Sequence, residues 1–203
     1  AKDTEVKVEW NTDTEAIVEN ELRKGQVKVI KVDKEDNEIK LQGVEFEVLN
    51  GEGNILEKIV TDENGEALTS RYPLRDFKQI YLKEVSTNEF YKLNDKKIEV
   101  TLEENEIKDV IVENEKKKGQ IKVIKVDLDN NEIRIPNVEF NVYDEAGKVV
   151  DTLITDENGE ATSIMLPIDQ EYTLKEEKTD KCYVLNDKPQ IGRAHVRTPV
   201  TTP

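Results

Sequence analysis

The sequence predicts an all-β protein made of tandem antiparallel β-sandwich modules in series. Three observations support this prediction: a long segment that occurs twice, short stretches in which apolar and polar residues alternate, and glycine-containing turn sequences between those stretches. Alternation with a period of two places successive side chains on opposite faces of a strand, so that one face can be buried. Several short strands of this kind are typical of a sandwich.

The repeat defines the modules. The segment AIVENELRKGQVKVIKVD at residues 16–33 recurs as VIVENEKKKGQIKVIKVD at residues 110–127, with four differences in eighteen positions and a spacing of 94 residues. The turn sequence TDENGEA occurs unchanged at residues 61–67 and 155–161. This period is longer than that of small solenoid repeats, so we expect each copy to be an independent domain.

Four segments follow from the alignment of the copies. Residues 1–20 match the end of a copy and are interpreted as the last hairpin of a truncated upstream module. Residues 21–114 form a complete first module, and residues 115–190 form a second module that lacks its C-terminal strand or strands. Residues 191–203, IGRAHVRTPVTTP, resemble the translation of a sequencing-library adaptor, and we interpret them as read-through that is not native. The alternative is a genuine linker rich in Pro and Thr.

The expected strands of the first module show the alternation directly. Val44, Phe46 and Val48, for example, alternate with Glu45 and Glu47. About seven short strands are expected in each copy. The clearest ones lie at residues 25–33, 44–48, 80–84, 98–102 and 110–114.

The sequence DENGE has the acidic character of a calcium-binding loop. The spacing of an EF-hand is not met, because no Glu lies at the required distance from the other ligands. We therefore predict a tight turn in which Gly65 and Gly159 have positive φ angles.

Composition excludes several classes of function. Of the 203 residues, 35% are hydrophobic and 37% are charged, which suits small modules with a large surface. The net charge of −15 would repel phosphate backbones and anionic lipid, so we expect no nucleic-acid partner. No stretch approaches the ~20 consecutive apolar residues of a membrane span, so no membrane insertion is expected.

Cys182 is the only cysteine and His195 is the only histidine. No internal disulfide is therefore possible, and we expect Cys182, next to Tyr183, to be a small apolar filler. Nucleophilic triads and histidine metal sites would all depend on His195, which lies in the doubtful tail. The prediction is that the protein is not an enzyme and has no cofactor-binding or metal-binding residues.

Three polar residues lie in phase with apolar residues that face the core. Lys31 follows Val27 and Val29, Glu84 follows Ile80 and Leu82, and Asn114 follows Val110 and Val112. Each of these polar groups would cost several kcal/mol if it were buried without a partner. We therefore expect Lys31, Glu84 and Asn114 to meet.

These segments together resemble a known family. GQVKVIKVD, VEFEVLN, TDENGEA, YLKEVSTNEFY and VIVEN, in this order, are similar to the B-type repeat of collagen-binding (Cna) adhesins, the SpaA-like prealbumin-fold domain of Gram-positive surface proteins and pilins. The resemblance covers essentially the whole chain outside residues 191–203. It implies a spontaneous intramolecular isopeptide bond between a Lys of the first strand and an Asn of the last, assisted by an acidic residue. By position these are Lys31, Asn114 and Glu84.

The implied chemistry is physically reasonable. Burial lowers the pKa of a lysine, and the neutral amine is the nucleophile. Glu84, acting as a buried acid, can hydrogen-bond the Asn114 carbonyl, polarise it and transfer protons while the Lys31 amine attacks and ammonia leaves. The alternative is a buried Lys31–Glu84 ion pair, with Asn114 as a hydrogen-bonding residue at a strand end.

The second module has an incomplete set of these residues. Lys125 and Glu176 occupy the positions of Lys31 and Glu84, but the expected Asn is absent. Asn20 is the opposite case, because its Lys and Glu would lie upstream of residue 1. Lys125 and Asn20 are therefore expected to be unpaired half-sites.

The resemblance implies a mechanical function. The modules would form the stalk or spacer of a bacterial cell-surface adhesin or pilin-like protein that is extracellular and attached to the cell wall. Its partners would be neighbouring modules of the same chain, with host extracellular matrix or glycan bound through other domains. The alternative is an adhesin module that binds a host matrix protein or glycan directly.

Overall fold

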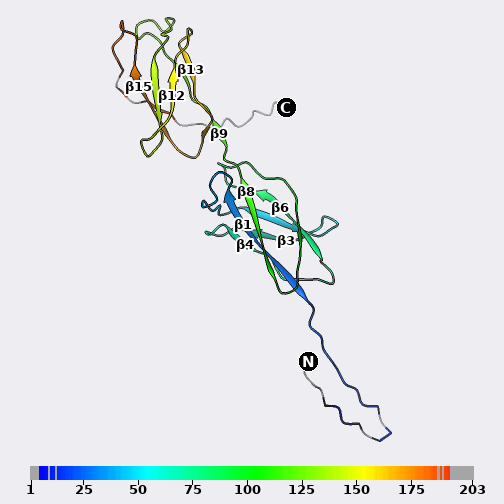
Figure 1. Ribbon diagram of the computed structural model, residues 1–203. Coiled ribbons are helices and arrows are strands. Elements are labelled where there is room, and N and C mark those ends of the chain that lie inside the picture. Colours follow the sequence, from blue (N-terminus) through cyan, green and yellow to red (C-terminus); the bar gives the residue numbers. More distant parts are fainter. Residues whose placement is uncertain (1–4, 9, 12, 187, 189, 193–203) are drawn as a thin grey trace.

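The computed structural model describes residues 5–8, 10–11, 13–186, 188 and 190–192. Two modules follow one another along an elongated molecule, and the N-terminal segment extends from the end of the first module that lies away from the second (Figure 1). Every regular element in these residues is a strand. None of them forms a helix that is long and apolar enough to cross a membrane. The all-β prediction is confirmed.

Eight strands form the first module: β1 (Lys24–Asp33), β2 (Glu45–Leu49), β3 (Ile55–Val60), β4 (Glu66–Leu68), β5 (Tyr72–Pro73), β6 (Gln79–Ser86), β7 (Ile98–Thr101) and β8 (Ile107–Asn114). One sheet has the order β4-β1-β5, with β8 also paired to β1, and the other has the order β3-β2-β6-β7. The two sheets pack face to face. Side chains at alternate positions fill the space between them, and the core includes Val27, Val29, Phe46, Val48 and Leu82.

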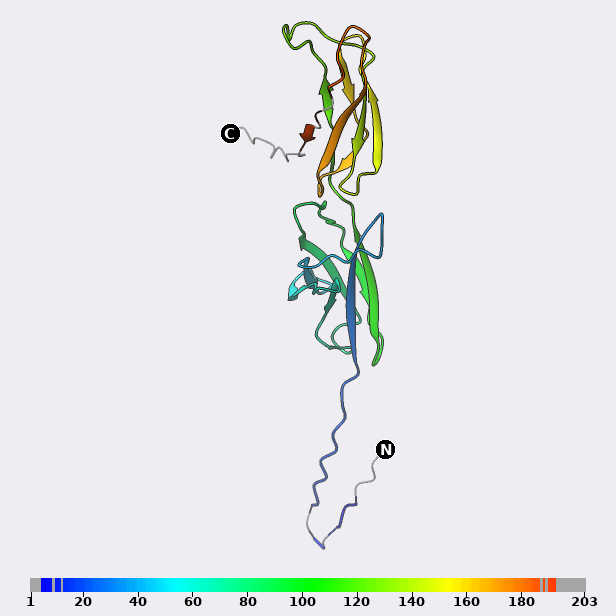
Figure 2. The same cartoon turned by 90° about the vertical axis from the view of Figure 1, so that its left-hand side faces the viewer.

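The pairing of β8 with β1 is parallel, with Gln26 opposite Ile107 and Asp33 opposite Asn114. The predicted arrangement was antiparallel, and the remaining strand pairs of the module are antiparallel. Figure 2 shows the two strands side by side along the length of the module. In a module that continues into the next one, the first strand leads in at one end and the last strand leads out at the other. Both therefore run in the same direction.

Eight further strands follow: β9 (Lys118–Gly119), β10 (Lys122–Ile124), β11 (Glu139–Tyr143), β12 (Val149–Ile154), β13 (Glu160–Thr162), β14 (Leu166–Pro167), β15 (Tyr172–Lys178) and β16 (Gln190–Gly192). They repeat the plan of the first module, with β12-β11-β15-β16 as the larger sheet. In the described part of this module, no strand takes the place that β8 has beside β1. Where the first module has the single long strand β1, the second module has two short strands, β9 and β10.

Strand β16 extends into the segment that the sequence analysis assigned to the tail. Its residues Gln190–Gly192 pair with β15 in the way that β7 pairs with β6. Strand pairing uses the backbone N–H and C=O groups, which every residue except proline has. A segment can therefore pair with β15 largely irrespective of its side chains. The second module thus has an edge strand at the β7 position. Residues 193–203, which include His195, lie outside the described residues.

The N-terminal segment reverses direction near Asn11, which has a φ angle of 59°. The Thr14 hydroxyl reaches back to the Lys7 carbonyl at 3.5 Å, but no strand is assigned among the described residues before Lys24. Trp10 and Ile17 are almost fully exposed. An isolated two-stranded hairpin is at best marginally stable in water, because it has no core on which to bury an apolar face.

Cys182 is exposed, so the expectation that it fills a core position was wrong. It lies in the turn after β15, where its backbone N–H donates to the Asp180 carboxylate at 2.8 Å. The neighbouring Tyr183 packs against the second core instead.

The DENG turn holds the backbone of Lys31. Gly65 has a φ angle of 69° and Gly159 one of 68°, as predicted. The Gly65 carbonyl accepts the Lys31 N–H at 2.7 Å, and a Cβ atom on Gly65 would lie 2.6 Å from the Lys31 carbonyl oxygen. Glycine is therefore required here for two reasons, the positive φ and the close approach of β1.

Substitution of Gly65 by Ala should lower the free energy of unfolding of the first module by about 2 kcal/mol. Gly53→Ala is the matched control, because Gly53 has a φ angle of 88° but open space where the Cβ would lie. That control should lose only about 1 kcal/mol. Hydrogen exchange of the β1 amides measures both. Equal losses of stability in Gly65→Ala and Gly53→Ala would show that the close approach of Gly65 to Lys31 does not contribute to stability.

Candidate functional site

Three strands place the polar residues of the first module in one buried cluster. Lys31 lies in β1 and Asn114 ends β8, so the two belong to adjacent parallel strands of one sheet. Glu84 lies in β6 of the opposite sheet, where it is paired with Phe46. Relative exposures are 0% for Lys31, 2% for Glu84 and 1% for Asn114. The structure brings all three together inside the hydrophobic core.

The distances within the cluster are those of direct contacts. The Lys31 Nζ donates to Asn114 Oδ1 at 2.7 Å and lies 3.0 Å from Glu84 Oε2. The Asn114 Nδ2 donates to Glu84 Oε1 at 2.6 Å. The Oε2 oxygen of Glu84 makes no hydrogen bond besides its ion contact with Lys31. Each side chain thus touches the other two.

The role expected for Glu84 at the Asn114 carbonyl was wrong in one respect. Glu84 contacts the amide nitrogen of Asn114, and Lys31 occupies the side of the carbonyl oxygen. The carboxylate therefore bridges the Lys31 amine and the amide nitrogen, one oxygen to each. A carboxylate accepts hydrogen bonds and a lysine only donates them, so this orientation gives both Lys31 Nζ and Asn114 Nδ2 an acceptor on Glu84.

Burial lowers the pKa of Lys31 below its ordinary value, and the hydrogen bond and charge of Glu84 oppose part of that shift. The desolvation effect is the larger of the two because the ammonium has no contact with water. A lowered pKa increases the fraction of lysine present as the neutral amine. The site can therefore supply a nucleophile directly beside an amide carbonyl.

A hollow of about 480 Å³ lies next to the cluster, lined in part by Asn94, Ile98, Val112 and Asn114. Asn114 is one of its lining residues, so the hollow adjoins the buried cluster. In the part of the chain that the structure describes, no group of three or more His, Cys, Asp and Glu side chains is arranged to hold a metal ion.

The corresponding residues of the second module form only a pair. Lys125 Nζ contacts Glu176 Oε2 at 2.7 Å, and the other carboxylate oxygen, Oε1, is buried without a hydrogen-bond partner. A hollow of about 420 Å³ lies beside Lys125. Asn20 is exposed in the N-terminal segment. The structure therefore places Lys125 with Glu176 and does not bring Asn20 to a lysine.

One protein-family model matches two regions of the chain. The model of the SpaA prealbumin-like fold domain matches residues 25–116 and again residues 119–194. The chain belongs to this family. Each SpaA-type module thus corresponds to one of the two matched regions, and the fold has the prealbumin-like form that the resemblance implied.

Solved structures include similar proteins. The Bacillus anthracis TIE protein is similar over 84% of this chain, with 29% identity and a TM-score of 0.71. The match covers 31% of that protein, so this chain spans about a third of its length. No curated protein sequence matches the chain.

Two pilins were also found, at lower structural similarity. The shaft pilin SpaA of Lactobacillus rhamnosus GG has 14% identity and a TM-score of 0.39, covering 84% of this chain and 93% of that one. BcpA, the major pilin subunit of Bacillus cereus, has 13% identity and a TM-score of 0.40, covering 83% and 95%. The family assignment rests on the family model and not on these two matches.

Asp33 is a buried residue of the SpaA-type module that the sequence analysis missed. Its carboxylate accepts the Tyr91 hydroxyl at 2.7 Å and the backbone N–H groups of Glu35 at 2.6 Å and Asp36 at 3.2 Å. Burial raises the pKa of Asp33, but these hydrogen bonds outweigh burial and hold the pKa below its ordinary value. The recurrence of the Asp–Tyr pair as Asp127 and Tyr183 was the available signal.

The same carboxylate faces residues 115–118, which lead from the end of β8 into the second module and are called the linker below. Lys116 Nζ lies 3.8 Å from Asp33 and 2.8 Å from Asp169 of the second module. Lys118 Nζ lies 2.6 Å from Glu35. Cations of the linker therefore connect to both modules, and Asp33 joins this junction to the strand that carries Lys31.

Stability that depends on the Asp33 carboxylate should be lost in acid. Because its folded pKa lies below the unfolded value near 3.8, this contribution is complete above the unfolded pKa and disappears as the pH falls through the folded pKa. The thermal unfolding midpoint of the native chain should therefore exceed that of Asp33→Asn at about pH 6, and the difference should shrink as the pH falls through the folded pKa of Asp33. A difference that stays constant over this range would contradict the assignment.

Proposed function

We propose that the first module forms an isopeptide bond between Lys31 and Asn114 and acts as a covalently locked stalk module of a cell-surface protein. The observation that carries the proposal is the 2.7 Å contact between the Lys31 amine and the Asn114 amide inside a closed core. Fixing two reacting groups in contact replaces a bimolecular encounter and lowers the barrier to reaction.

In the proposed reaction the neutral Lys31 amine attacks Cγ of Asn114. The new bond joins Nζ to Cγ, the bond from Cγ to Nδ2 breaks, and one ammonia leaves. Glu84 takes the proton that Nζ loses and delivers it to Nδ2, because its two oxygens contact these two nitrogens. The carboxylate is regenerated, so no other reactant is consumed. Ammonia departs through the hollow beside Asn114.

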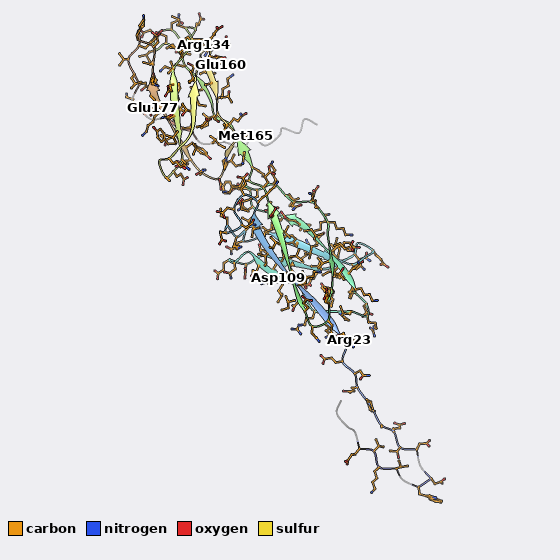
Figure 3. All side chains as sticks on the ribbon, viewed as in Figure 1. Arg23, Asp109, Arg134, Glu160, Met165 and Glu177 are labelled. Atoms are coloured by element: carbon orange, nitrogen blue, oxygen red, sulfur yellow. The ribbon has the colours of Figure 1, made fainter. Side chains whose placement is uncertain are left out.

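The position of the bond suits a module under tension. Force along the chain enters β1 near Arg23, at the end of the module marked in Figure 3, and leaves through the end of β8 at Asn114. Because β1 and β8 are parallel, Lys31 lies near the same exit end as Asn114. A bond between them carries the load from β1 directly into the linker. The chain between them, including β2 to β7, is then bypassed.

This mechanical role has consequences for location and partners. We infer an extracellular protein attached to a cell wall, because the family match supports a pilin-like structural role. The immediate partners are the neighbouring modules of the same chain, contacted through linker residues such as Lys116. Direct binding of a host matrix protein or glycan stays a prediction of the sequence.

Single-molecule pulling on the two ends of the chain tests the locked stalk. The 83-residue separation between Lys31 and Asn114 corresponds to a contour of about 280 Å when fully extended. With the bond in place, this length should never be released, and only the second module should give a large unfolding step. In the variant with Lys31→Met and Glu84→Gln, a second large step should appear. Two large steps from the native chain would contradict the proposal.

A further inference from the structure

We infer that Thr87 is a positioning residue of the crosslinking reaction, whose hydroxyl holds the amide nitrogen of Asn114 in the orientation that exposes the carbonyl to Lys31. This inference rests on the proposed isopeptide reaction and adds a fourth residue to it. It comes from the hydrogen bonds of the first module and from two buried atoms of the second module that have no partner.

The Asn114 amide is held at both of its hydrogens. Its Nδ2 donates to Glu84 Oε1 at 2.6 Å and to Thr87 Oγ1 at 3.0 Å. An amide nitrogen has two N–H donors, and these two acceptors use both. The plane of the amide is thereby fixed, and Oδ1 is directed at the Lys31 amine. A flipped amide would place its carbonyl oxygen against the Glu84 carboxylate and its N–H groups against the Lys31 amine.

A rigid turn sets the position of Thr87. The residue comes directly after β6, three positions beyond Glu84, and is partly buried. The next residue, Asn88, accepts the N–H of Phe90 on its side chain at 2.8 Å and the N–H of Tyr91 on its carbonyl at 3.1 Å. The strand and the turn fix the backbone on both sides of Thr87.

The second module contains the same arrangement without the Asn. Thr179 follows Glu176 at the same spacing, and Asp180 forms the equivalent turn with the N–H groups of Cys182 at 2.8 Å and Tyr183 at 2.9 Å. Here the Thr179 hydroxyl oxygen and the Glu176 Oε1 are both buried and have no hydrogen-bond partner.

These two unpartnered atoms are the counterparts of the two acceptors that bind the amide in the first module. Buried polar atoms are rarely left unpaired, because each one loses its hydration without compensation. The pair of Glu and Thr three residues apart therefore forms a receptor for a side-chain amide in both modules. In the first module Asn114 occupies it.

The hydrogen bond from Asn114 Nδ2 to Thr87 Oγ1 has a defined role in the reaction. As Nδ2 takes up a proton and becomes the leaving group, positive charge develops on this nitrogen. The Thr87 oxygen already accepts one of its hydrogens and stabilises that charge without reorganisation. Thr87 does not touch Lys31, so it acts on the orientation and departure of the amide nitrogen and leaves the nucleophile unchanged.

The test measures the rate of crosslinking in Thr87→Val, which keeps the shape of the side chain and removes the hydroxyl. The full chain is made by cell-free synthesis, samples are quenched in acid at intervals, and intact-mass spectrometry follows the loss of one ammonia. We expect bond formation to be roughly tenfold slower, because one hydrogen bond to the reacting group is lost. Thr87→Ser, which keeps the hydroxyl, should restore the native rate.

Two controls separate positioning from a structural effect. Thr179→Val makes the same change where no Asn is bound, and it should leave the rate unchanged without lowering the thermal unfolding midpoint. The rate of Thr87→Val should also rise with pH over the same range as that of the native chain, because this rise follows the titration of Lys31. A rise displaced to higher pH would mean that the core had loosened around Lys31, and the positioning role would be wrong.

The outcomes also distinguish this inference from the proposed function. If the native chain keeps its full mass, the isopeptide reaction fails and the role of Thr87 fails with it. If the native chain loses ammonia and Thr87→Val does so at the same rate, only the role of Thr87 is overturned. Slow crosslinking in Thr87→Ser would also overturn the role of Thr87, because the hydroxyl would then not be the group that sets the rate.

Discussion

Substitution of Glu84 by Gln is expected to slow isopeptide formation by a factor between about a hundred and ten thousand, the usual contribution of a general acid and base. The Gln side chain has nearly the same shape, but its amide cannot take a proton from Lys31 and pass it to the Asn114 nitrogen. Both contacts of the present carboxylate, 3.0 Å to Nζ and 2.6 Å to Nδ2, are needed for that transfer. The variant module should fold and lose ammonia far more slowly than the native one.

The measurement is the mass of the purified chain as a function of time after folding. The matched control is Glu176→Gln, which makes the same change in the module whose lysine has no Asn partner. That control should lose one ammonia at the native rate, because the reaction takes place in the first module. If Glu84→Gln reacted as fast as the control, Glu84 would have no part in the proton transfer.

Loss of the bond is expected to lower the free energy of unfolding of the first module by about 4.5 kcal/mol, if the closed loop behaves like that of a disulfide. The estimate follows from the 83-residue separation of Lys31 and Asn114. The appropriate variant combines Lys31→Met with Glu84→Gln. Removing Lys31 alone would leave a buried unpaired charge, which itself costs about 3–5 kcal/mol.

Hydrogen exchange of the β2 and β6 amides in the full chain reports on the first module separately from the second. The parallel variant Lys125→Met with Glu176→Gln removes an uncrosslinked ion pair, and its effect should be close to neutral because apolar residues often replace a buried pair without loss. Equal protection in the native chain and in the first-module variant would show that no covalent lock is present.

Period-two reasoning could predict which residues face the core. It predicts that the side chains of Lys31, Glu84 and Asn114 point inward, and all three are buried. The signal was strong because each of them continues a row of apolar residues on one strand face. The glycine turn was predictable for a similar reason, since Asp-Glu-Asn-Gly favours a positive φ angle at its last position.

Features that depend on contacts between distant segments could not be predicted in the same way. Alternation assigns a face to a residue of β8 but not the direction of the strand, so the parallel pairing with β1 was missed. Thr87 lies just beyond the end of β6, where the turn interrupts the alternation, whereas Asp33 continues the inward row of β1 and its partners come from distant segments. The expectation for Cys182, which rested on its residue type and not on alternation, was wrong because the residue lies exposed in the turn after β15. The recurrence of Thr at the matching position of the second copy was the sequence signal for Thr87, and the phase with Lys31 was an additional signal for Asp33.

The most direct test of the central claim is the intact mass of the folded 203-residue chain under denaturing conditions. We predict a mass lower by one ammonia than the sequence requires. Fragmentation should then show Lys31 joined to Asn114, with Lys125 unmodified. A folded sample with the full mass of the sequence would contradict it.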